Sequence, residues 1–181
     1  MTSHLQYFII LVLLIVSSLA CQSGQNNEHH PIPDLTLISE NKGNPAGSFA
    51  LESLNGEEVS LKGLRGKVVF LTFWLSSCEA CLEEMPSIER LYNKLRDKDF
   101  IVLAVNLGEE KDRVEQYARI LGVSFPILMD SSGSVAKTYS IEPIPVTYII
   151  DKHGTILGKA VGRRQWDSPK SVRYFNWLCQ Q

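Results

Sequence analysis

Long apolar runs in this chain predict strands that are buried on both faces. Residues 68–74 (Val-Val-Phe-Leu-Thr-Phe-Trp) form one such run, and Phe100–Asn106 forms a second. Runs of this kind are typical of the central strands of a parallel or mixed sheet. Shorter strands are expected at 126–129, 146–151 and 155–161. The last two are separated by a turn at Lys152-His153-Gly154, which predicts a hairpin that closes the sheet.

Apolar residues spaced three and four apart predict the helices. Between Ala80 and Arg96 they recur at positions 82, 85, 88, 91, 92 and 95, which predicts a long amphipathic helix. Further helices are expected at 112–121, 134–139 and from 167 or 168 to 178. Strands that alternate with helices predict an α/β fold with a central mixed β-sheet and helices on both faces.

A short hairpin is expected to extend this domain at its N-terminal end. Asn55-Gly56 separates two short strands, Phe49–Leu54 and Glu58–Leu61, and this dipeptide is typical of a type I′ turn. No internal repeat is present, so one domain is expected over residues 47–181.

The N-terminal segment predicts export from the cytoplasm. Residues 7–16 (YFIILVLLIV) are uninterrupted apolar, a length that suits the core of a signal peptide, so residues 1–20 are predicted to be a signal peptide or N-terminal anchor. The following Ser-Leu-Ala-Cys21 resembles a bacterial lipobox, which favours lipidation of Cys21. An uncleaved anchor or a signal cut elsewhere are the alternatives. Residues 21–46 are predicted to be a polar tether that holds an extracytoplasmic domain (periplasm or cell envelope) at the membrane.

The charge balance excludes a nucleic-acid partner. The formal net charge is −2, from 18 Lys and Arg against 20 Asp and Glu. Proteins or small thiols are therefore the expected partners. Of the four cysteines, Cys179 lies in the last helix and receives no predicted role.

The Cys78-Glu79-Ala80-Cys81 motif lies where the first apolar run passes into the long helix, and it predicts a redox site. Two intervening residues bring both sulfurs into one helical turn, and the helix N-terminus favours a thiolate. Cys78 is placed to attack a disulfide and Cys81 to resolve the mixed disulfide. A zinc site would need further ligands at suitable spacing, and none is present. A purely structural disulfide is disfavoured because so short a loop constrains little chain entropy.

Ile144-Pro145 gives the second element of the expected site. Pro145 immediately precedes a predicted strand, where an X-Pro bond can be cis and expose the backbone of Ile144 at the sheet edge. A loop of this kind opposite the cysteine pair would offer a bound peptide a strand-like partner.

Several segments together resemble the TlpA/ResA branch of the thioredoxin superfamily. They are Phe73-Trp74 with the cysteine motif and Met85-Pro86, residues 104–109 (AVNLGE), 122–126 (GVSFP) and 144–151 (IPVTYIID) with Gly154. The resemblance covers roughly Ser48 to Trp166. It implies a thioredoxin fold and a membrane-tethered protein that reduces protein disulfides. In the ResA-like members it implies apocytochrome c as a substrate. It also implies re-reduction by a membrane thiol transporter of the DsbD or CcdA kind, and no cofactor beyond the Cys78–Cys81 disulfide.

The same resemblance implies roles for individual residues. Pro145 corresponds to the cis-proline, Glu79 to an acidic residue inside the motif and Glu109 to a glutamate that lines the site. A carboxylate near a thiolate raises its pKa and can move a proton. Ser77 stands where relatives carry Trp, Ala80 stands where Pro is common, and Ser77 could hydrogen-bond the thiolate.

Three other residues near the motif receive lesser roles. Trp74 is expected to be core or a site wall, and Glu83 and Glu84 are expected to be ordinary first-turn acids of the helix.

Two other functions remain as alternatives. A thiol peroxidase of the peroxiredoxin type shares the fold but would need Thr and Pro shortly before the reactive cysteine, which residues 75–77 (Leu-Ser-Ser) do not supply. A copper-handling or thiol-binding module is the non-enzymatic alternative.

Overall fold

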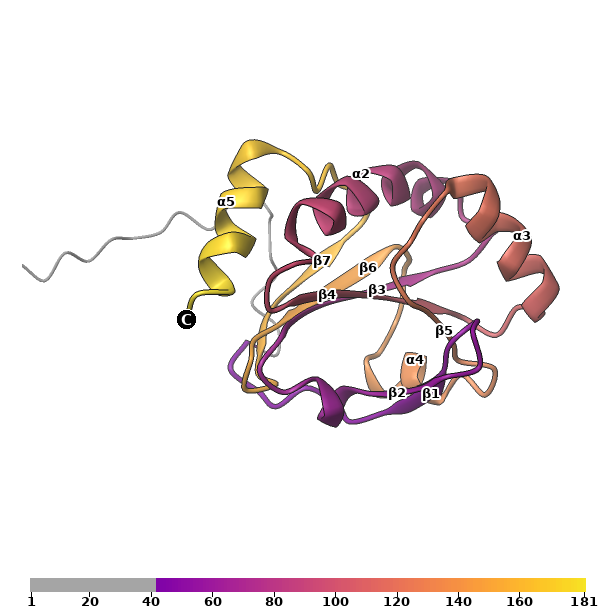
Figure 1. The fold of residues 1–181 in the computed structure, drawn as a ribbon. Coiled ribbons are helices and arrows are strands. Elements are labelled where there is room, and N and C mark those ends of the chain that lie inside the picture. The colour runs from indigo at the N-terminus through magenta and orange to yellow at the C-terminus, as the bar shows by residue number, and fades with distance from the viewer. Residues whose placement is uncertain (1–41) are drawn as a thin grey trace, which may run out of the picture. The chain divides into compact units, whose positions relative to one another are not determined.

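The computed structural model describes residues 42–181, and a five-stranded mixed sheet forms its centre (Figure 1). The strand order is β5-β4-β3-β6-β7. Three strands run parallel, namely β3 (Val68–Trp74), β4 (Phe100–Asn106) and β5 (Ile127–Met129). The remaining two are antiparallel to their neighbours, namely β6 (Val146–Ile150) and β7 (Ile156–Val161). The predicted signal peptide, Cys21 and all of the tether before residue 42 lie outside the described residues.

The middle strand β3 is buried along its whole length, as its apolar run predicts. All seven of its residues are buried, and it pairs in register with β4 from Val68↔Phe100 to Trp74↔Asn106. Because parallel strands end at the same edge of a sheet, the residues that follow Trp74 and Asn106 meet there. This edge carries the candidate site.

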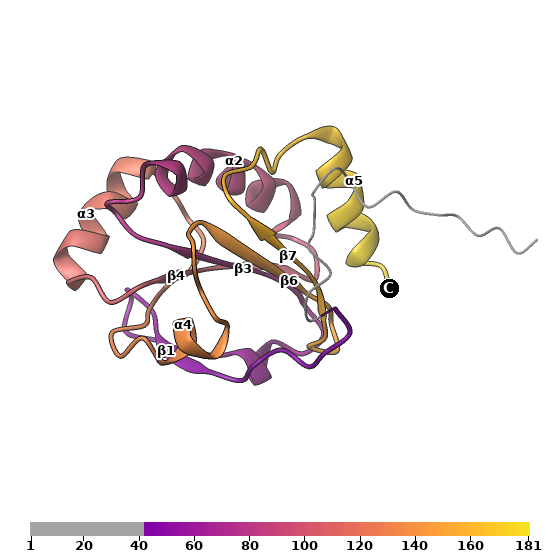
Figure 2. The ribbon, with the colours of Figure 1, turned by 180° about the vertical axis from the view of Figure 1, so that it is seen from behind.

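The two faces of the sheet are covered differently (Figures 1 and 2). One face packs against the three longer helices, α2 (Glu79–Leu95), α3 (Lys111–Leu121) and α5 (Pro169–Leu178). The other face packs against the short helix α4 (Ser134–Thr138), the 3₁₀ helix η1 (Leu61–Leu64), and the hairpin of β1 (Ala50–Glu52) and β2 (Glu58–Ser60). Helices therefore lie on both faces, as predicted, although only short ones lie on the second.

The turn of the β1–β2 hairpin differs from the sequence prediction. Glu52 pairs with Glu58, the N–H of Gly56 donates to the carbonyl of Ser53, and that of Ser53 donates to the carbonyl of Glu57. A type I′ turn needs positive φ at both central residues, but here only Gly56 has it, at +83°. The type I′ prediction is therefore wrong, and the loop is a longer one that uses the glycine for its left-handed residue.

Helix ends follow the capping chemistry in the sequence. α3 ends at Gly122, which adopts φ +62° and donates its N–H to the carbonyls of Ala118 and Arg119. The side chain of Ser168 accepts a hydrogen bond from the N–H of Ser171 at the start of α5, with Pro169 as the first helical residue. Among residues 42–181, no helix is long and apolar enough to cross a membrane.

Candidate active site

A disulfide joins Cys78 and Cys81 at the junction of β3 and α2. The S–S distance is 2.09 Å and the Cα atoms are 5.2 Å apart. β3 ends at Trp74, and a turn over residues 75–77 redirects the chain into α2. Cys78 is the N-cap of α2 and has extended backbone angles. The pair therefore lies at the carboxyl end of the central strand, where open α/β sheets place their sites.

The two sulfurs have unequal surroundings. Cys81 is fully buried, whereas Cys78 is half-buried and reaches the surface. The Cys78 Sγ accepts a hydrogen bond from the N–H of Cys81 at 3.2 Å. The N–H groups and dipole at a helix start favour a thiolate over a thiol. When the disulfide is reduced, Cys78 is thus both the accessible sulfur and the one better placed to ionise.

The segment before β6 lies at the same edge of the sheet. The Ile144–Pro145 peptide is cis, as predicted. β6 runs antiparallel to β3 with Phe73 opposite Val146, so Pro145 follows in register opposite the end of β3. Pro145 is buried, and its carbonyl accepts a hydrogen bond from the N–H of Gly162 at 2.9 Å. Ile144 is half-buried and, like Cys78, packs against the core cluster that contains Cys81.

Glu109 binds the turn that leads to Cys78. Its carboxylate accepts hydrogen bonds from the N–H of Ser76 at 2.7 Å and from the Ser76 hydroxyl at 2.5 Å. The Asn106 side-chain amide donates to the same carboxylate at 2.8 Å, and the Arg113 guanidinium lies 3.2 Å away. Glu109, predicted to line the site, thus binds Ser76 in the turn before Cys78.

These contacts keep Glu109 ionised. Partial burial raises the pKa of this carboxyl group, but the hydrogen bonds from Ser76 and Asn106 and the charge of Arg113 outweigh burial, so its pKa is lowered. This permanent carboxylate binds Ser76, two residues before Cys78, and so fixes the turn in place. It does not act as a group that gains and loses protons near neutral pH.

The other predicted site residues divide between surface and core. Ser77 and Glu79 are exposed at the rim of the disulfide. Trp74 is fully buried in the same core cluster as Cys81, and its indole N–H finds no acceptor among residues 42–181. Of the two expectations for Trp74, the structure therefore favours core.

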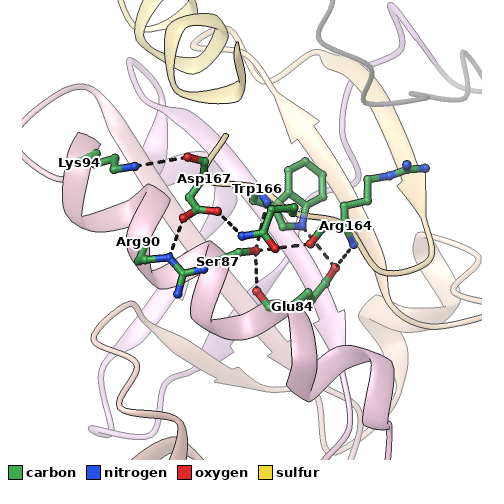
Figure 3. Close-up of polar contacts among 8 residues, drawn as sticks. Glu84, Ser87, Arg90, Lys94, Arg164, Trp166 and Asp167 are labelled. Carbon is green, nitrogen blue, oxygen red and sulfur yellow. Dashed lines mark hydrogen bonds and ion pairs between the residues drawn. The ribbon is translucent and has the colours of Figure 1, made fainter. Parts of the chain in front are cut away.

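Glu84 is buried, which differs from the role predicted from its sequence position. It was expected to be an ordinary first-turn acid, yet it is only 2% exposed. One oxygen, Oε2, accepts hydrogen bonds from the backbone N–H of Arg164 at 3.1 Å and from the indole N–H of Trp166 at 3.3 Å (Figure 3). It lies three residues after Cys81 on α2, so the two side chains share one face of the helix.

Burial sets the proton affinity of Glu84. Desolvation raises its pKa to about 7, although the hydrogen bonds from Arg164 and Trp166 and the charges of Arg164 and Arg163 lower it in part. A carboxyl group with this pKa changes its protonation near neutral pH. The sequence did carry a signal, because positions 81, 84, 88, 91 and 95 form one helical stripe in which Glu84 alone is charged.

No metal site accompanies the cysteine pair in the described part of the chain. Residues 42–181 contain no group of three or more His, Cys, Asp or Glu side chains that could hold an ion. The remaining cysteine there, Cys179, is buried, and burial raises the pKa of its thiol to about 11.

Comparison with known proteins gives one consistent result. Residues 42–158 match the model of the AhpC/TSA family. The chain is 35% identical over 155 residues to the thiol-disulfide oxidoreductase ResA of Bacillus subtilis, covering 86% of this chain and 84% of the relative. It is 40% identical over 115 residues to ResA of Halalkalibacterium halodurans, covering 64% of this chain and 65% of that relative, slightly under two thirds.

A solved structure shows the same fold. A thiol:disulfide interchange protein described as putative DsbE, from Chlorobium tepidum, superposes with a TM-score of 0.66 at 29% identity and covers 76% of this chain and 94% of that one. The mixed five-stranded sheet with its flanking helices is thus a thioredoxin-like fold, as the motifs indicated.

Proposed function

Because this chain belongs to the AhpC/TSA family, and within it to the ResA-like thiol-disulfide oxidoreductases, we propose that it reduces protein disulfides outside the cytoplasm. The observation that carries this proposal is the Cys78–Cys81 disulfide at the start of α2, with one sulfur accessible and the other buried. Unequal exposure assigns the attacking role to Cys78 and the resolving role to Cys81.

The reaction starts from the reduced pair. The Cys78 thiolate attacks a disulfide of the partner protein, so that a mixed disulfide forms and one partner sulfur leaves as a thiolate. The Cys81 thiol then loses its proton and attacks the Cys78 sulfur. The Cys78–Cys81 disulfide forms, the second partner sulfur leaves, and two electrons have passed to the partner, whose thiolates take up protons.

Glu84 is the group best placed to accept the proton of Cys81. The two residues lie on one buried face of α2, where no bulk water competes, and the pKa of Glu84 of about 7 allows both protonation states. In the reverse direction, during re-reduction, the same carboxyl group returns the proton to Cys81. Half-buried Ile144 and buried Pro145 form the bend that leads into β6, and the partner peptide can align along this segment.

Location and partners form the finer part of the proposal. The apolar residues 7–16 and the Ser-Leu-Ala-Cys21 sequence support export and lipid attachment at Cys21, which would hold the domain at the membrane. The resemblance to the TlpA/ResA branch supports apocytochrome c as the proposed substrate class and a membrane thiol transporter of the DsbD or CcdA kind as the proposed electron donor.

Trapping of the mixed disulfide tests the reductase proposal. In Cys81→Ser the first step can occur but the second cannot, so a stable mixed disulfide with a model protein disulfide should accumulate and be released by dithiothreitol. Cys78→Ser is the matched control and should trap nothing, because the Cys81 thiol that remains is fully buried and the pKa of about 11 keeps the buried thiol of Cys179 protonated. Absence of a Cys78-linked adduct, together with no reduction of the model disulfide by the wild type, would sink the proposal.

The same preparation separates the alternative functions. A thiol peroxidase would consume hydrogen peroxide at a rate set by Cys78 even without a disulfide substrate. A copper-binding module would bind Cu(I) tightly through both cysteines and reduce no disulfide.

A further inference from the structure

The segment that joins β7 to α5 lies along α2 and is fastened to it by a row of hydrogen bonds (Figure 3). Besides the two bonds to the Glu84 carboxylate, the backbone N–H of Trp166 donates to the Ser87 hydroxyl at 3.1 Å. Ser87 in turn donates to the carbonyl of Glu84 at 2.8 Å. Further along the helix, the Arg90 guanidinium donates to Asp167 at 2.6 Å. Glu84 is thus bound from outside its own helix by a segment about 80 residues away in sequence.

The indole of Trp166 has little freedom to move. Its side chain is fully buried, with its ring centroid 4.6 Å from Phe70 of the central strand and 6.5 Å from Phe175 of α5. The edge-on contact with Phe70 of the sheet, the closer of the two rings, fixes the direction of the indole N–H. Since that N–H donates to Glu84, it fixes the carboxyl group as well.

Both outside donors bind the same carboxyl oxygen. The backbone N–H of Arg164 and the indole N–H of Trp166 both donate to Oε2 of Glu84. Two donors on one oxygen hold the carboxyl group in a single orientation. The charges around it are Arg163 and Arg164 of the same segment, and Glu83 on α2, which pairs with Arg163 at 3.0 Å.

We propose that Trp166 is a positioning residue, whose indole N–H orients the Glu84 carboxyl group for proton exchange with Cys81 when the mixed disulfide is resolved. The inference rests on the proposed function, since it concerns the second step of disulfide reduction. In that step the Cys81 S–H gives its proton to the Glu84 carboxylate while its sulfur attacks Cys78. The bond between Cys78 and the partner sulfur breaks, the electron pair leaves on that sulfur, and the proton passes from Glu84 to the departing thiolate.

Trp166→Phe removes the indole donor and retains most of the ring packing. Losing a hydrogen bond to the ionised form disfavours the carboxylate, so the midpoint of Glu84 ionisation should move upward by roughly one pH unit. Less carboxylate is then available to accept the Cys81 proton. At pH 7 the resolution rate should fall about fivefold, and the rate should recover at higher pH.

The direct measurement is a ¹³C NMR titration of the glutamate side chains in the oxidised protein. It is paired with stopped-flow reduction of a model protein disulfide by the reduced protein from pH 5 to 9. Phe175→Leu is the control for packing, because Phe175 contacts Trp166 but makes no hydrogen bond to Glu84. It should lower stability and leave both pH profiles in place. Ser87→Ala, which removes the acceptor of the Trp166 backbone N–H, gives a second test if Trp166→Phe does not fold.

The outcomes separate this inference from the function on which it rests. A shift of the Glu84 midpoint in Trp166→Phe or Ser87→Ala, absent in Phe175→Leu, supports the positioning role. An unshifted midpoint in both variants overturns it, even when Glu84→Gln slows resolution. If Glu84→Gln itself leaves the resolution rate and its pH profile unchanged, the proton role of Glu84 in the proposed function fails as well.

Discussion

Replacement of Glu84 by Gln measures how strongly the buried carboxyl group destabilises the fold. Glutamine has nearly the same shape, and its carbonyl oxygen can accept the N–H groups of Arg164 and Trp166 that now bind Oε2. The variant therefore removes the ionisation while leaving the hydrogen bonds in place. Any dependence of stability on pH that disappears in Glu84→Gln belongs to this group.

The magnitude follows from the two pKa values. The pKa of Glu84 is about 7 in the folded protein against 4.5 ordinarily, a difference that corresponds to about 3 kcal/mol. Because the folded-state value is the higher one, the folded protein holds a proton that the unfolded chain has already lost. Stability is therefore fully retained below pH 4.5, falls as the pH rises to about 7, and stays low above it. The variant should match the wild type at low pH and exceed it by about 3 kcal/mol at pH 8.

Urea unfolding of the oxidised protein, followed from pH 4 to 8, checks this expectation. Glu83→Gln is the matched control, because Glu83 is the preceding residue and is exposed. Its profile should run parallel to that of the wild type. If Glu84→Gln also runs parallel to the wild type, Glu84 is not a buried carboxyl group with raised pKa, and the proton path through it has no basis.

Two further predictions concern Glu109 and Cys21. Glu109→Ala leaves the N–H and hydroxyl of Ser76 without their acceptor, so the free energy of unfolding at pH 7 should fall by about 2 kcal/mol. The stabilisation by Glu109 should be lost as the pH falls through its lowered pKa, and a loss that persists unchanged in acid, measured by urea unfolding, would contradict the ionised clamp. Cys21→Ser should move the protein from the membrane fraction to the soluble extracytoplasmic fraction, with disulfide reductase activity kept. Retention at the membrane would indicate an uncleaved anchor instead.

The elements that the sequence predicts well are those whose signal is local. The apolar run of β3 and the three-and-four spacing of α2 lie within single segments, and both elements form within a residue or two of the expected bounds. The cysteine motif is also local, because the strand, the turn and the helix that place it are consecutive.

Features that depend on distant contacts were less predictable. The hairpin turn at Gly56 follows from its pairing register, which Asn55-Gly56 alone does not determine. Glu109 was expected near the cysteines because of a resemblance, but its binding to Ser76 depends on the parallel register that ends β3 and β4 at one edge. Nothing in the residues next to Glu109 specifies that partner.

The burial of Glu84 lowers the stability of the fold but suits its proposed role in proton transfer. An exposed glutamate at this helical position would keep its ordinary pKa. The segment that carries Trp166 buries Glu84 instead, and above pH 7 this burial lowers the free energy of unfolding of the protein by about 3 kcal/mol. An apolar residue or glutamine would avoid that destabilisation, as Leu91 and Ile88 do on the same stripe of α2. A carboxyl group whose pKa is matched to neutral pH, one turn from a buried thiol that must lose its proton, gives the destabilisation a chemical use. The position of Glu84 is thus better explained by the chemistry of Cys81 than by the packing of the core.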